Sequence, residues 1–309
     1  MSLRGRLAPS PTGVLHLGNA RSFLLAWLDV RARGGSLLLR IEDLDGPRVK
    51  RGADQAAIED LRWLGLDWDE GPVYQRPRLP AYQAALQELA GRGLAYPCCC
   101  SRKDVERAAS APHAGDEGPV YPGTCRGRWP DAAAARDETG RDPCWRFAVP
   151  AAEELEVPDR FTGARRWRVA EELGDFVIWK RDGEPAYQLA VVVDDSAQGV
   201  TEVLRGDDLL PSAARQTLLY RALGAPPPSF AHLPLVVGPD GRRLAKRHGD
   251  TTLRSFREGG TDPAELCGWL AALSGLAPSG SRRLPADLVS GFRLDRVAAA
   301  PAVWSGPGR

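Results

Sequence analysis

The stretch that decides the fold is Arg6-Leu7-Ala8-Pro9-Ser10-Pro11-Thr12-Gly13, followed closely by His16-Leu17-Gly18-Asn19. Residues 5–8 predict a short strand, two prolines exclude a helix from the turn, and residues 20–33 repeat apolar side chains at helical spacing. The histidine and asparagine of the second stretch therefore fall at the start of a helix. Unpaired backbone N–H groups and the positive end of the helix dipole suit that place to phosphates.

The composition is that of an ordinary globular protein. Of 309 residues, 43% are hydrophobic and 26% are charged, and the formal net charge is +1. This charge gives no overall attraction to nucleic acid. No apolar run approaches the roughly 18 residues of a membrane helix, and the N-terminus does not resemble a secretory signal. We therefore expect a cytoplasmic protein that makes no membrane contact.

The order of elements predicts an α/β fold with a Rossmann-like, doubly wound parallel sheet. A buried strand is expected at residues 36–41, and the carboxylates directly after it face the ligand crevice of such a sheet. Helices are expected at residues 53–64 and 79–92, with a loop around Pro72 between them. The dinucleotide fingerprint G-x-G-x-x-G is absent, so the Pro-Ser-Pro-Thr-Gly turn must hold phosphate in another way.

The domain organisation follows from where this pattern stops and resumes. Residues 1–95 are predicted to be the first half of the Rossmann-like domain, residues 96–170 an insertion, and residues 171–275 the second half. Apolar runs at 175–179, 187–195 and 203–208 are expected to resume the sheet. Residues 276–309, rich in proline, glycine and alanine, are predicted to be a loosely ordered tail.

Six cysteines, three of them adjacent, do not resemble a secreted disulfide framework and indicate metal binding. One residue separates Cys98 from Cys100, and Cys125 follows later in the chain. Such thiolates can close a tetrahedron about zinc, and closed zinc sites usually stabilise a fold. His113 is an alternative fourth ligand, and Cys99 could exchange with a neighbour. The competing interpretation is a set of buried reduced thiols.

His16-Leu17-Gly18-Asn19 and the later Arg243-Leu244-Ala245-Lys246-Arg247 resemble the HIGH and KMSKS motifs of the class I aminoacyl-tRNA synthetases, in their glutamyl branch. The resemblance covers residues 5–275. Three further stretches follow the family's order and spacing: Arg40-Ile41-Glu42-Asp43, Tyr187-Gln188-Leu189-Ala190 and Leu204-Arg205-Gly206-Asp207.

Within that branch the chain is most similar to short paralogues that lack the anticodon-binding part. Only 62 residues follow Arg247, too few for a further domain of about 100 residues. Val191 stands where glutamyl-tRNA synthetases typically carry an asparagine. We therefore expect a chain without an anticodon-binding domain.

This resemblance implies a monomeric ligase with two steps. ATP, with Mg²⁺, and L-glutamate would form glutamyl-adenylate without tRNA, and the glutamate would then pass to queuosine in the anticodon of tRNA(Asp). One alternative is a truncated glutamyl-tRNA synthetase that charges a tRNA 3′ end. Another is an inactive RNA-binding paralogue, which only Asn19 and Ala245 favour.

Glutamate presents two carboxylates and one ammonium, so its recognition needs arginines and an acid. The resemblance assigns glutamate binding to six positions: Arg6, Ala8, Ser10, Glu42, Tyr187 and Arg205. It assigns ATP binding to His16, Gly18, Asn19 and Lys246, and the catalytic roles to His16, Asn19 and Lys246. Asn19 can donate a hydrogen bond but carries no charge, and Lys246 would bring a mobile ammonium to the phosphates.

The short paralogues carry a C-x-C and a Y-x3-C motif. Resemblance to them implies that Tyr121 is the fourth zinc ligand, beside Cys98, Cys100 and Cys125. Gly127 stands where a C-x-H pair would need its histidine. No motif marks a queuosine pocket. The candidate RNA contacts are Arg160, Arg165, Arg166 and Arg168, with Trp167 to stack on a base, and the alternative is a solvated strand face.

Overall fold

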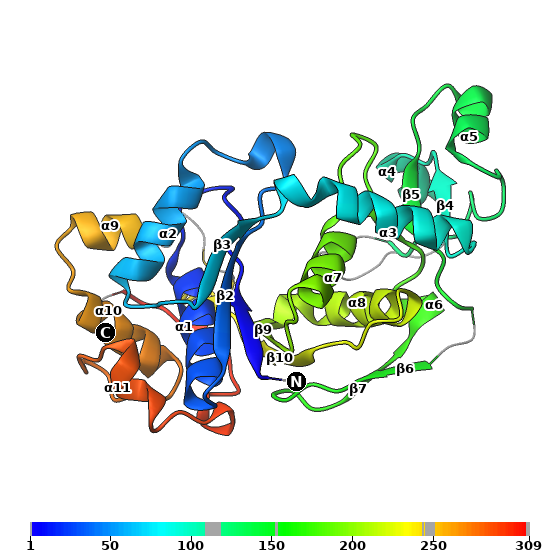
Figure 1. The fold of residues 1–309 in the computed structure, drawn as a ribbon. Helices are drawn as coiled ribbons and strands as arrows, with labels where there is room; N and C mark the ends of the chain where they lie inside the picture. Colours follow the sequence, from blue (N-terminus) through cyan, green and yellow to red (C-terminus); the bar gives the residue numbers. More distant parts are fainter. Residues whose placement is uncertain (1, 109–118, 152–153, 243, 245–250, 307–309) are drawn as a thin grey trace.

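Five parallel strands form the centre of the protein (Figure 1). The computed structural model describes residues 2–108, 119–151, 154–242, 244 and 251–306. The central strands are β1 (Arg4–Leu7), β2 (Ser36–Ile41), β3 (Glu70–Tyr74), β9 (Glu202–Gly206) and β10 (Ser229–Leu233). β1 pairs with β2, β2 with β3, and β9 with β10.

The two halves of the chain meet between β1 and β9. Thr201 N, just before β9, donates to Arg4 O at 2.9 Å, and Arg4 N donates to Thr201 Oγ1 at 2.9 Å. The spatial order is therefore β3-β2-β1-β9-β10. The direction of winding reverses between β1 and β9, and ligands of open α/β sheets bind at such a switch point, beyond the carboxyl ends of the strands.

Helices cover both faces of these strands, which confirms the predicted α/β arrangement. Figure 1 shows α1 (Leu17–Ala32), α2 (Ala53–Trp63), α10 (Pro263–Leu273) and α11 (Pro285–Val289) on one side. It shows α3 (Leu79–Gly91), α7 (Tyr187–Ala197) and α8 (Leu210–Ala222) on the other. A separate apolar core fills each side. None of the helices in the described part of the chain is long and apolar enough to cross a membrane.

An insertion interrupts the parallel sheet, as predicted, but this insertion continues beyond residue 170. β4 (Ala95–Cys98), β5 (Cys144–Phe147) and β8 (Phe176–Trp179) form an antiparallel sheet, and β6 (Glu154–Val157) and β7 (Arg165–Arg168) form an antiparallel ribbon. The prediction that residues 175–179 resume the catalytic sheet is wrong, because β8 pairs with β5. Two short helices, α4 (Arg102–Ala108) and α5 (Ala132–Thr139), complete this segment, and α6 (Val169–Glu172) follows the ribbon.

The apolar run at residues 187–195 is also not a strand, because it forms helix α7. Its three valines favour a strand locally. The helix instead places Asp194 and Asp195 against Arg78 and Arg40, which pair with these carboxylates at 2.6 Å in both cases. Tertiary ion pairing thus outweighs the local propensity.

The loop expected around Pro72 is the edge strand β3, and an edge position tolerates proline. Gly71 lies within this strand at φ +103°, and a Cβ there would stand 2.3 Å from Leu39 O. Only glycine lets β3 approach β2 so closely at this point.

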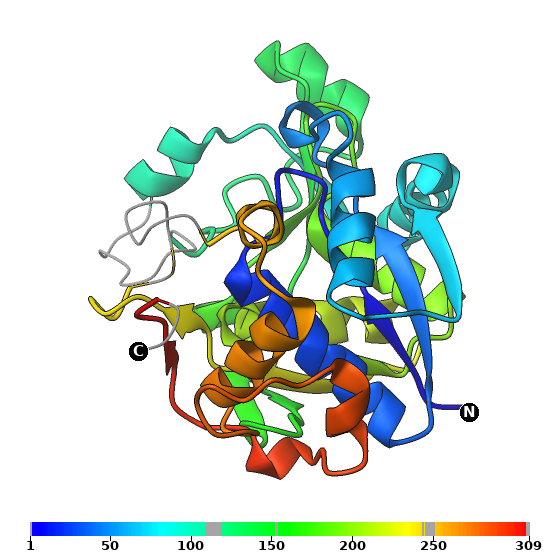
Figure 2. The same ribbon diagram turned by 90° about the vertical axis from the view of Figure 1, so that its left-hand side faces the viewer.

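The predicted loose tail is wrong for residues 276–306, which fold back onto the catalytic domain (Figure 2). β12 (Ala302–Val303) pairs in parallel with β11 (Val236–Val237), and Trp304 N donates to Val237 O at 2.8 Å. The Trp304 ring packs against Trp269 and Phe256, with centroids 5.7 and 6.2 Å away. Composition suggested disorder, but a few apolar side chains anchor the whole segment.

We predict that Trp304→Ala lowers the free energy of unfolding by about 3 kcal/mol or more, because it removes a buried aromatic side chain. Urea denaturation measures this, with Val303→Ala as the control, since Val303 is 53% exposed and Trp304 only 7%. Equal, small effects of the two substitutions would mean that the segment is not packed in solution.

Candidate active site

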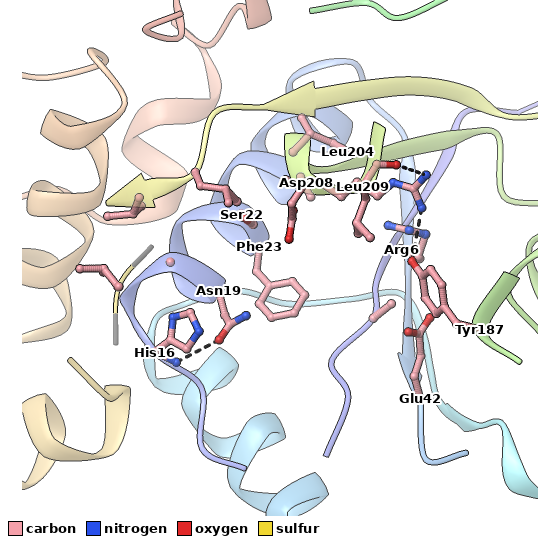
Figure 3. Close-up of a pocket in the computed structure, with 18 residues that line it drawn as sticks. Arg6, His16, Asn19, Ser22, Phe23, Glu42, Tyr187, Leu204, Asp208 and Leu209 are labelled. Atoms are coloured by element: carbon pink, nitrogen blue, oxygen red, sulfur yellow. Dashed lines mark hydrogen bonds between the residues drawn. The ribbon is translucent and has the colours of Figure 1, made fainter. Parts of the chain in front are cut away.

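A cavity of about 190 Å³ lies at the switch point, beside the N-terminus of α1 (Figure 3). Nearly all the residues predicted to bind glutamate and ATP, apart from those in the KMSKS-like loop, line it. These are Arg6, Ala8, His16, Gly18, Asn19, Glu42, Tyr187 and Arg205. Ser10 is the exception, because it is exposed and does not line the cavity.

The start of α1 forms one end of the cavity. His16 is the N-cap residue, and Asn19 Oδ1 accepts a hydrogen bond from His16 N at 3.2 Å. The side chain of Asn19 therefore caps its own helix. A Cβ at Gly18 would lie only 3.2 Å from the His16 ring, so glycine at this position leaves room for the ring. The end of the cavity near α1 thus offers an imidazole, an amide and a helix N-terminus, all suited to phosphate oxygens.

Leu244, within the KMSKS-like segment, and Thr251, which follows that segment, both lie at this same end of the cavity. Leu244 lines the cavity, and Leu17 N donates to Thr251 O at 2.8 Å. Leu253 N also donates to Leu15 O at 2.9 Å. Lys246, with Arg243, Ala245 and Arg247, lies outside the described residues. The chain on both sides of Lys246 is therefore fixed next to His16.

Four polar side chains gather at the other end of the cavity, as Figure 3 shows for Arg6, Glu42 and Tyr187. Arg205 donates to Tyr187 Oη at 3.3 Å. Arg6 lies on β1, in the floor of the cavity, and is only 7% exposed. Its Nε has no hydrogen-bond partner among the described residues. A buried donor without a partner is costly, so this site is built to receive an acceptor.

A buried ion-pair network supports this end from below. Arg40, fully buried on β2, donates to Glu42 Oε1 at 3.1 Å, to Asp195 Oδ1 at 2.6 Å and to Gln198 Oε1 at 2.8 Å. Asp195 Oδ1 lies 3.7 Å from Arg6 Nε. Arg40 therefore holds Glu42 in position, and Asp195 is an ion-pair partner of both Arg40 and Arg6.

The charges at this end do not cancel. Of the charged side chains that line this end, Arg6 and Arg205 are positive and Glu42 is negative. Asp208 also lines the cavity but lies further toward Phe23 in Figure 3. The lining of this end thus carries one more positive than negative charge, which favours a ligand with a negatively charged group.

Burial raises the pKa of Glu42, and the nearby guanidinium groups of Arg40 and Arg6 oppose that rise. Burial also lowers the pKa of Arg205, which the neighbouring Tyr187 opposes. Burial thus disfavours the charged forms of both the glutamate and the arginine at this end of the cavity. A charged ligand group that replaces water here would offset that cost.

Sequence analysis missed the residues that hold this site in place. Asp195, Gln198 and Arg78 support it, and Phe23, Asp208 and Leu209 complete its lining. One signal was available for the acids, because Asp194 and Asp195 end an otherwise apolar run. Charged residues in a buried segment are almost always paired.

The cysteine cluster predicted from the sequence is present. The sulfur atoms of Cys98, Cys100 and Cys125 lie within 4.8 Å of one another, and those of Cys100 and Cys125 are 3.4 Å apart. Tyr121 Oη stands 3.4 Å from Cys98 Sγ and 3.6 Å from Cys100 Sγ. Tetrahedral zinc–sulfur bonds would place sulfurs roughly 3.8 Å apart. The cluster could therefore bind a metal ion.

Surrounding groups favour a thiolate at this cluster. Hydrogen bonds from Cys144 and Tyr121, together with the Arg146 guanidinium, lower the pKa of Cys98 to about 4 against the effect of burial. Arg146 donates to Cys98 Sγ at 3.3 Å and lies 3.8 Å from the centroid of the Tyr121 ring. The thiolate is the form that binds metal.

Cys99 points away from the cluster, because successive side chains of an extended segment alternate in direction. Its Sγ accepts a hydrogen bond from Thr139 at 3.2 Å, near α5. The interpretation that Cys99 exchanges with a neighbouring ligand is therefore wrong for this structure. His113 lies outside the described residues.

The arginine-rich strand predicted as an RNA contact is paired within the protein. Arg166 bonds Glu156 at 2.8 Å, and Arg168 lies 2.8 Å from Glu171. Arg160 contacts the buried Asp29. Trp167 is 4% exposed, so the expectation that it stacks on a base is wrong. The alternative of a solvated strand face fits Arg166 and Arg168.

Known proteins resemble this chain along most of its length. A family model described as tRNA synthetases class I (E and Q), catalytic domain, matches residues 2–287. The Glutamyl-Q tRNA(Asp) synthetase of Symbiobacterium thermophilum is 51% identical over 97% of this chain and 95% of that protein. A Glutamate--tRNA ligase of Synechococcus sp. (strain JA-3-3Ab) is 42% identical over 99% of this chain, which spans only 64% of that protein.

A solved structure is similar as well. The glutamate tRNA ligase of Elizabethkingia meningosepticum, crystallised in complex with its amino acid, superposes with a TM-score of 0.82 at 28% identity. It covers 98% of this chain, which covers 67% of that one. The fold described above is thus that of a class I synthetase catalytic domain.

The ion-pair network predicts a stability effect. Asp195→Asn should lower the free energy of unfolding by about 3 kcal/mol, because it leaves the buried Arg40 short of a counter-charge. Urea denaturation measures this. The control is Asp182→Asn, in an exposed pair with Lys180 at 3.9 Å, which should change stability by less than about 1 kcal/mol. Equal losses would contradict the network's role.

Proposed function

Because this chain belongs to the glutamyl-Q tRNA(Asp) synthetases, a branch of the class I tRNA synthetases of the E and Q type, we propose that it activates L-glutamate with ATP and transfers it to queuosine in tRNA(Asp). The observation that carries this proposal is one cavity with a phosphate-suited end at His16 and a positively charged, carboxylate-suited end at Arg6 and Arg205. Two reacting substrates bound in one cavity gain the advantage of proximity.

At the charged end, the proposal assigns a role to each group of the amino acid. The guanidinium groups of Arg6 and Arg205 bind carboxylate oxygens, Tyr187 donates its hydroxyl, and Glu42 accepts from the ammonium. Glu42 is already held by Arg40 at 3.1 Å, so it is oriented before the substrate arrives. Glutamate carries one net negative charge and matches the excess positive charge, whereas neutral glutamine does not. Ser10 would have to act from outside the described cavity.

At the α1 end, the proposed first step is phosphoryl chemistry. A carboxylate oxygen of glutamate attacks the α-phosphorus of ATP, which forms an anhydride and releases pyrophosphate. Negative charge shifts onto phosphate oxygens, which His16, the amide of Asn19 and the helix N-terminus would stabilise. Lys246 would bring its ammonium to the same oxygens, since Leu244 before it lines the cavity and Thr251 after it bonds Leu17 N through its carbonyl oxygen. Mg²⁺ would accompany the ATP.

In the proposed second step, a hydroxyl of the queuosine ring attacks the activated carbonyl carbon. The ester forms, AMP leaves, and the hydroxyl proton is lost. Val191, one helical turn after Tyr187 on α7, is buried and apolar, so it offers no hydrogen bond to the amino acid. The chain is 51% identical to its glutamyl-Q relative and 42% identical to the glutamate–tRNA ligase, which supports the glutamyl-Q reaction over charging of a 3′ end.

The proposed metal is one structural zinc ion, held by Cys98, Cys100, Cys125 and Tyr121. The three sulfurs and the phenol oxygen converge, and no carboxylate or histidine among the described residues joins them. When bound, zinc would cross-link the segments around Cys98 and Cys125. The cluster is not part of the cavity lining, so the ion would support the fold rather than the chemistry.

ATP–pyrophosphate exchange tests the first step. We expect exchange with L-glutamate and no tRNA, followed by transfer of labelled glutamate to tRNA(Asp) only when it carries queuosine. Lys246→Ala should lower exchange by about a hundredfold, because it removes a charge from the transition state. Glu258→Ala, on the exposed end of α9 (Leu253–Glu258), is the control and should retain activity.

Two outcomes would overturn the proposal. Absence of glutamate-dependent exchange would exclude an enzyme of this kind and favour the inactive RNA-binding paralogue. Exchange that requires tRNA(Glu), with stable charging of its 3′ end, would favour the truncated glutamyl-tRNA synthetase.

Metal analysis tests the zinc proposal. The purified protein should hold about one zinc per chain, and Cys100→Ser should lose that zinc and lower the melting temperature, because metal binding contributes to folding. Cys267→Ser is the matched control, since Cys267 is buried in α10 away from the cluster. Zinc content unaffected by Cys100→Ser would refute this ligand set.

A further inference from the structure

Arg205 is held by a chain of buried polar groups that lies outside the cavity. Its guanidinium reaches the cavity, where it donates to Tyr187 Oη at 3.3 Å. Its Nε donates in the opposite direction, to His232 Nε2 at 3.0 Å. His232, on β10, is completely buried and does not line the cavity. Arg205 is therefore anchored from behind by a ring nitrogen that must be an acceptor.

The next group in the chain fixes that ring nitrogen as an acceptor. Asp159 Oδ2 lies 2.6 Å from His232 Nδ1, close enough for a short charge-assisted hydrogen bond. An ionised carboxylate can only accept, so Nδ1 carries the proton. A neutral imidazole then has its lone pair on Nε2, facing Arg205. Burial lowers the pKa of His232 against the pull of Asp159, which also favours the neutral ring.

Asp159 itself is held in its ionised form. Its Oδ1 accepts from the backbone N–H groups of Thr162 at 2.8 Å, Phe161 at 2.9 Å and His232 at 3.3 Å. These bonds and the imidazole lower the pKa of Asp159 to about 2, although its burial acts in the opposite direction. Asp159 lies in the loop between β6 and β7, within the segment that interrupts the parallel sheet. The next residue attaches this loop to β10, because Arg160 N donates to Phe230 O at 2.8 Å.

We propose that Asp159 and His232 are positioning residues for glutamate, which act by setting the acceptor tautomer that holds Arg205 at the amino-acid end of the cavity. The proposal rests on the proposed role of Arg205 in binding a substrate carboxylate. Its consequence is that residues without substrate contact control the affinity for glutamate. ATP binds at the other end, so its affinity does not depend on them.

Three nearly isosteric variants test this separation. In Asp159→Asn the carboxylate becomes an amide that can donate an N–H to His232 Nδ1, which shifts the ring proton to Nε2 so that Nε2–H opposes Arg205. His232→Asn keeps the donor toward Asp159 but removes the acceptor for Arg205. His232→Gln places an amide oxygen where Nε2 was and so keeps that acceptor. Thr162→Ala, which preserves the backbone bond in the same loop, is the control.

The measurement is the KM for glutamate and for ATP in pyrophosphate exchange, with urea denaturation of each variant alongside. We expect Asp159→Asn and His232→Asn to raise the glutamate KM by about tenfold or more, the scale of an unpaired buried polar group, with the ATP KM unchanged. His232→Gln should recover most of that loss, and Thr162→Ala should match the wild type.

Equal loss in His232→Gln and His232→Asn, or parallel rises in both KM values, would mean a merely structural role and would overturn the proposal. Arg205→Lys distinguishes this from failure of the proposed function. If Arg205→Lys raises the glutamate KM while both His232→Asn and Asp159→Asn leave it unchanged, only the positioning role is wrong. If the wild type shows no glutamate-dependent exchange, the proposed function itself is wrong.

Discussion

The ion pair between Arg40 and Asp195 is the constraint on which the rest of the site depends. Both groups are almost completely buried, and 2.6 Å separates Arg40 Nη1 from Asp195 Oδ1. Arg40 lies on β2 and Asp195 on α7, so the pair fastens the first half of the chain to the second. The same Arg40 holds Glu42, and the same Asp195 faces Arg6. Buried pairs cost desolvation energy and rarely add stability over apolar packing. Here their main effect is to fix the positions of charged groups.

This arrangement explains how one cavity can hold two chemically different substrates. The switch point between β1 and β9 opens the crevice, and the turn after β1 leads from Arg6 at one end to His16 at the other. One end carries a fixed excess of positive charge. The other end uses a helix N-terminus, which supplies partial charges and N–H donors. Residues after β10 and α10 support α1 from behind, because Arg21 of α1 donates to Pro234 O at 2.6 Å and to Ser274 Oγ at 3.0 Å.

Local sequence patterns predicted the first half of the fold well. The buried strand at residues 36–41 and the helix start at His16 depend on nearby residues alone: an apolar run in one case, and prolines before an apolar helix in the other. The site residues on these elements could therefore be placed on the strand, turn and helix that carry them. Residues 187–195 could not be assigned, because the acids that select a helix there pair with arginines more than 100 positions earlier.

The C-terminal segment was misjudged for a related reason. Its composition resembles a linker, and contacts with distant elements such as α10 and β11 order it. The positioning residues Asp159 and His232 were also beyond prediction from sequence, since nothing near either of them indicates that a loop carboxylate meets a strand histidine. Resemblance to a family supplied the residues proposed to touch the substrates, and the structure supplied the residues that hold those side chains.

The most direct test of this account is calorimetric titration of the protein with L-glutamate and with L-glutamine, without ATP or tRNA. The two ligands have almost the same shape and differ by one charge, so the comparison isolates the positive charge that Arg6 and Arg205 place in the lining of the cavity. We expect glutamate to bind at least about a hundredfold more tightly than glutamine, because the neutral amide of glutamine forms no ion pair with these arginines. Equal affinities would contradict the account.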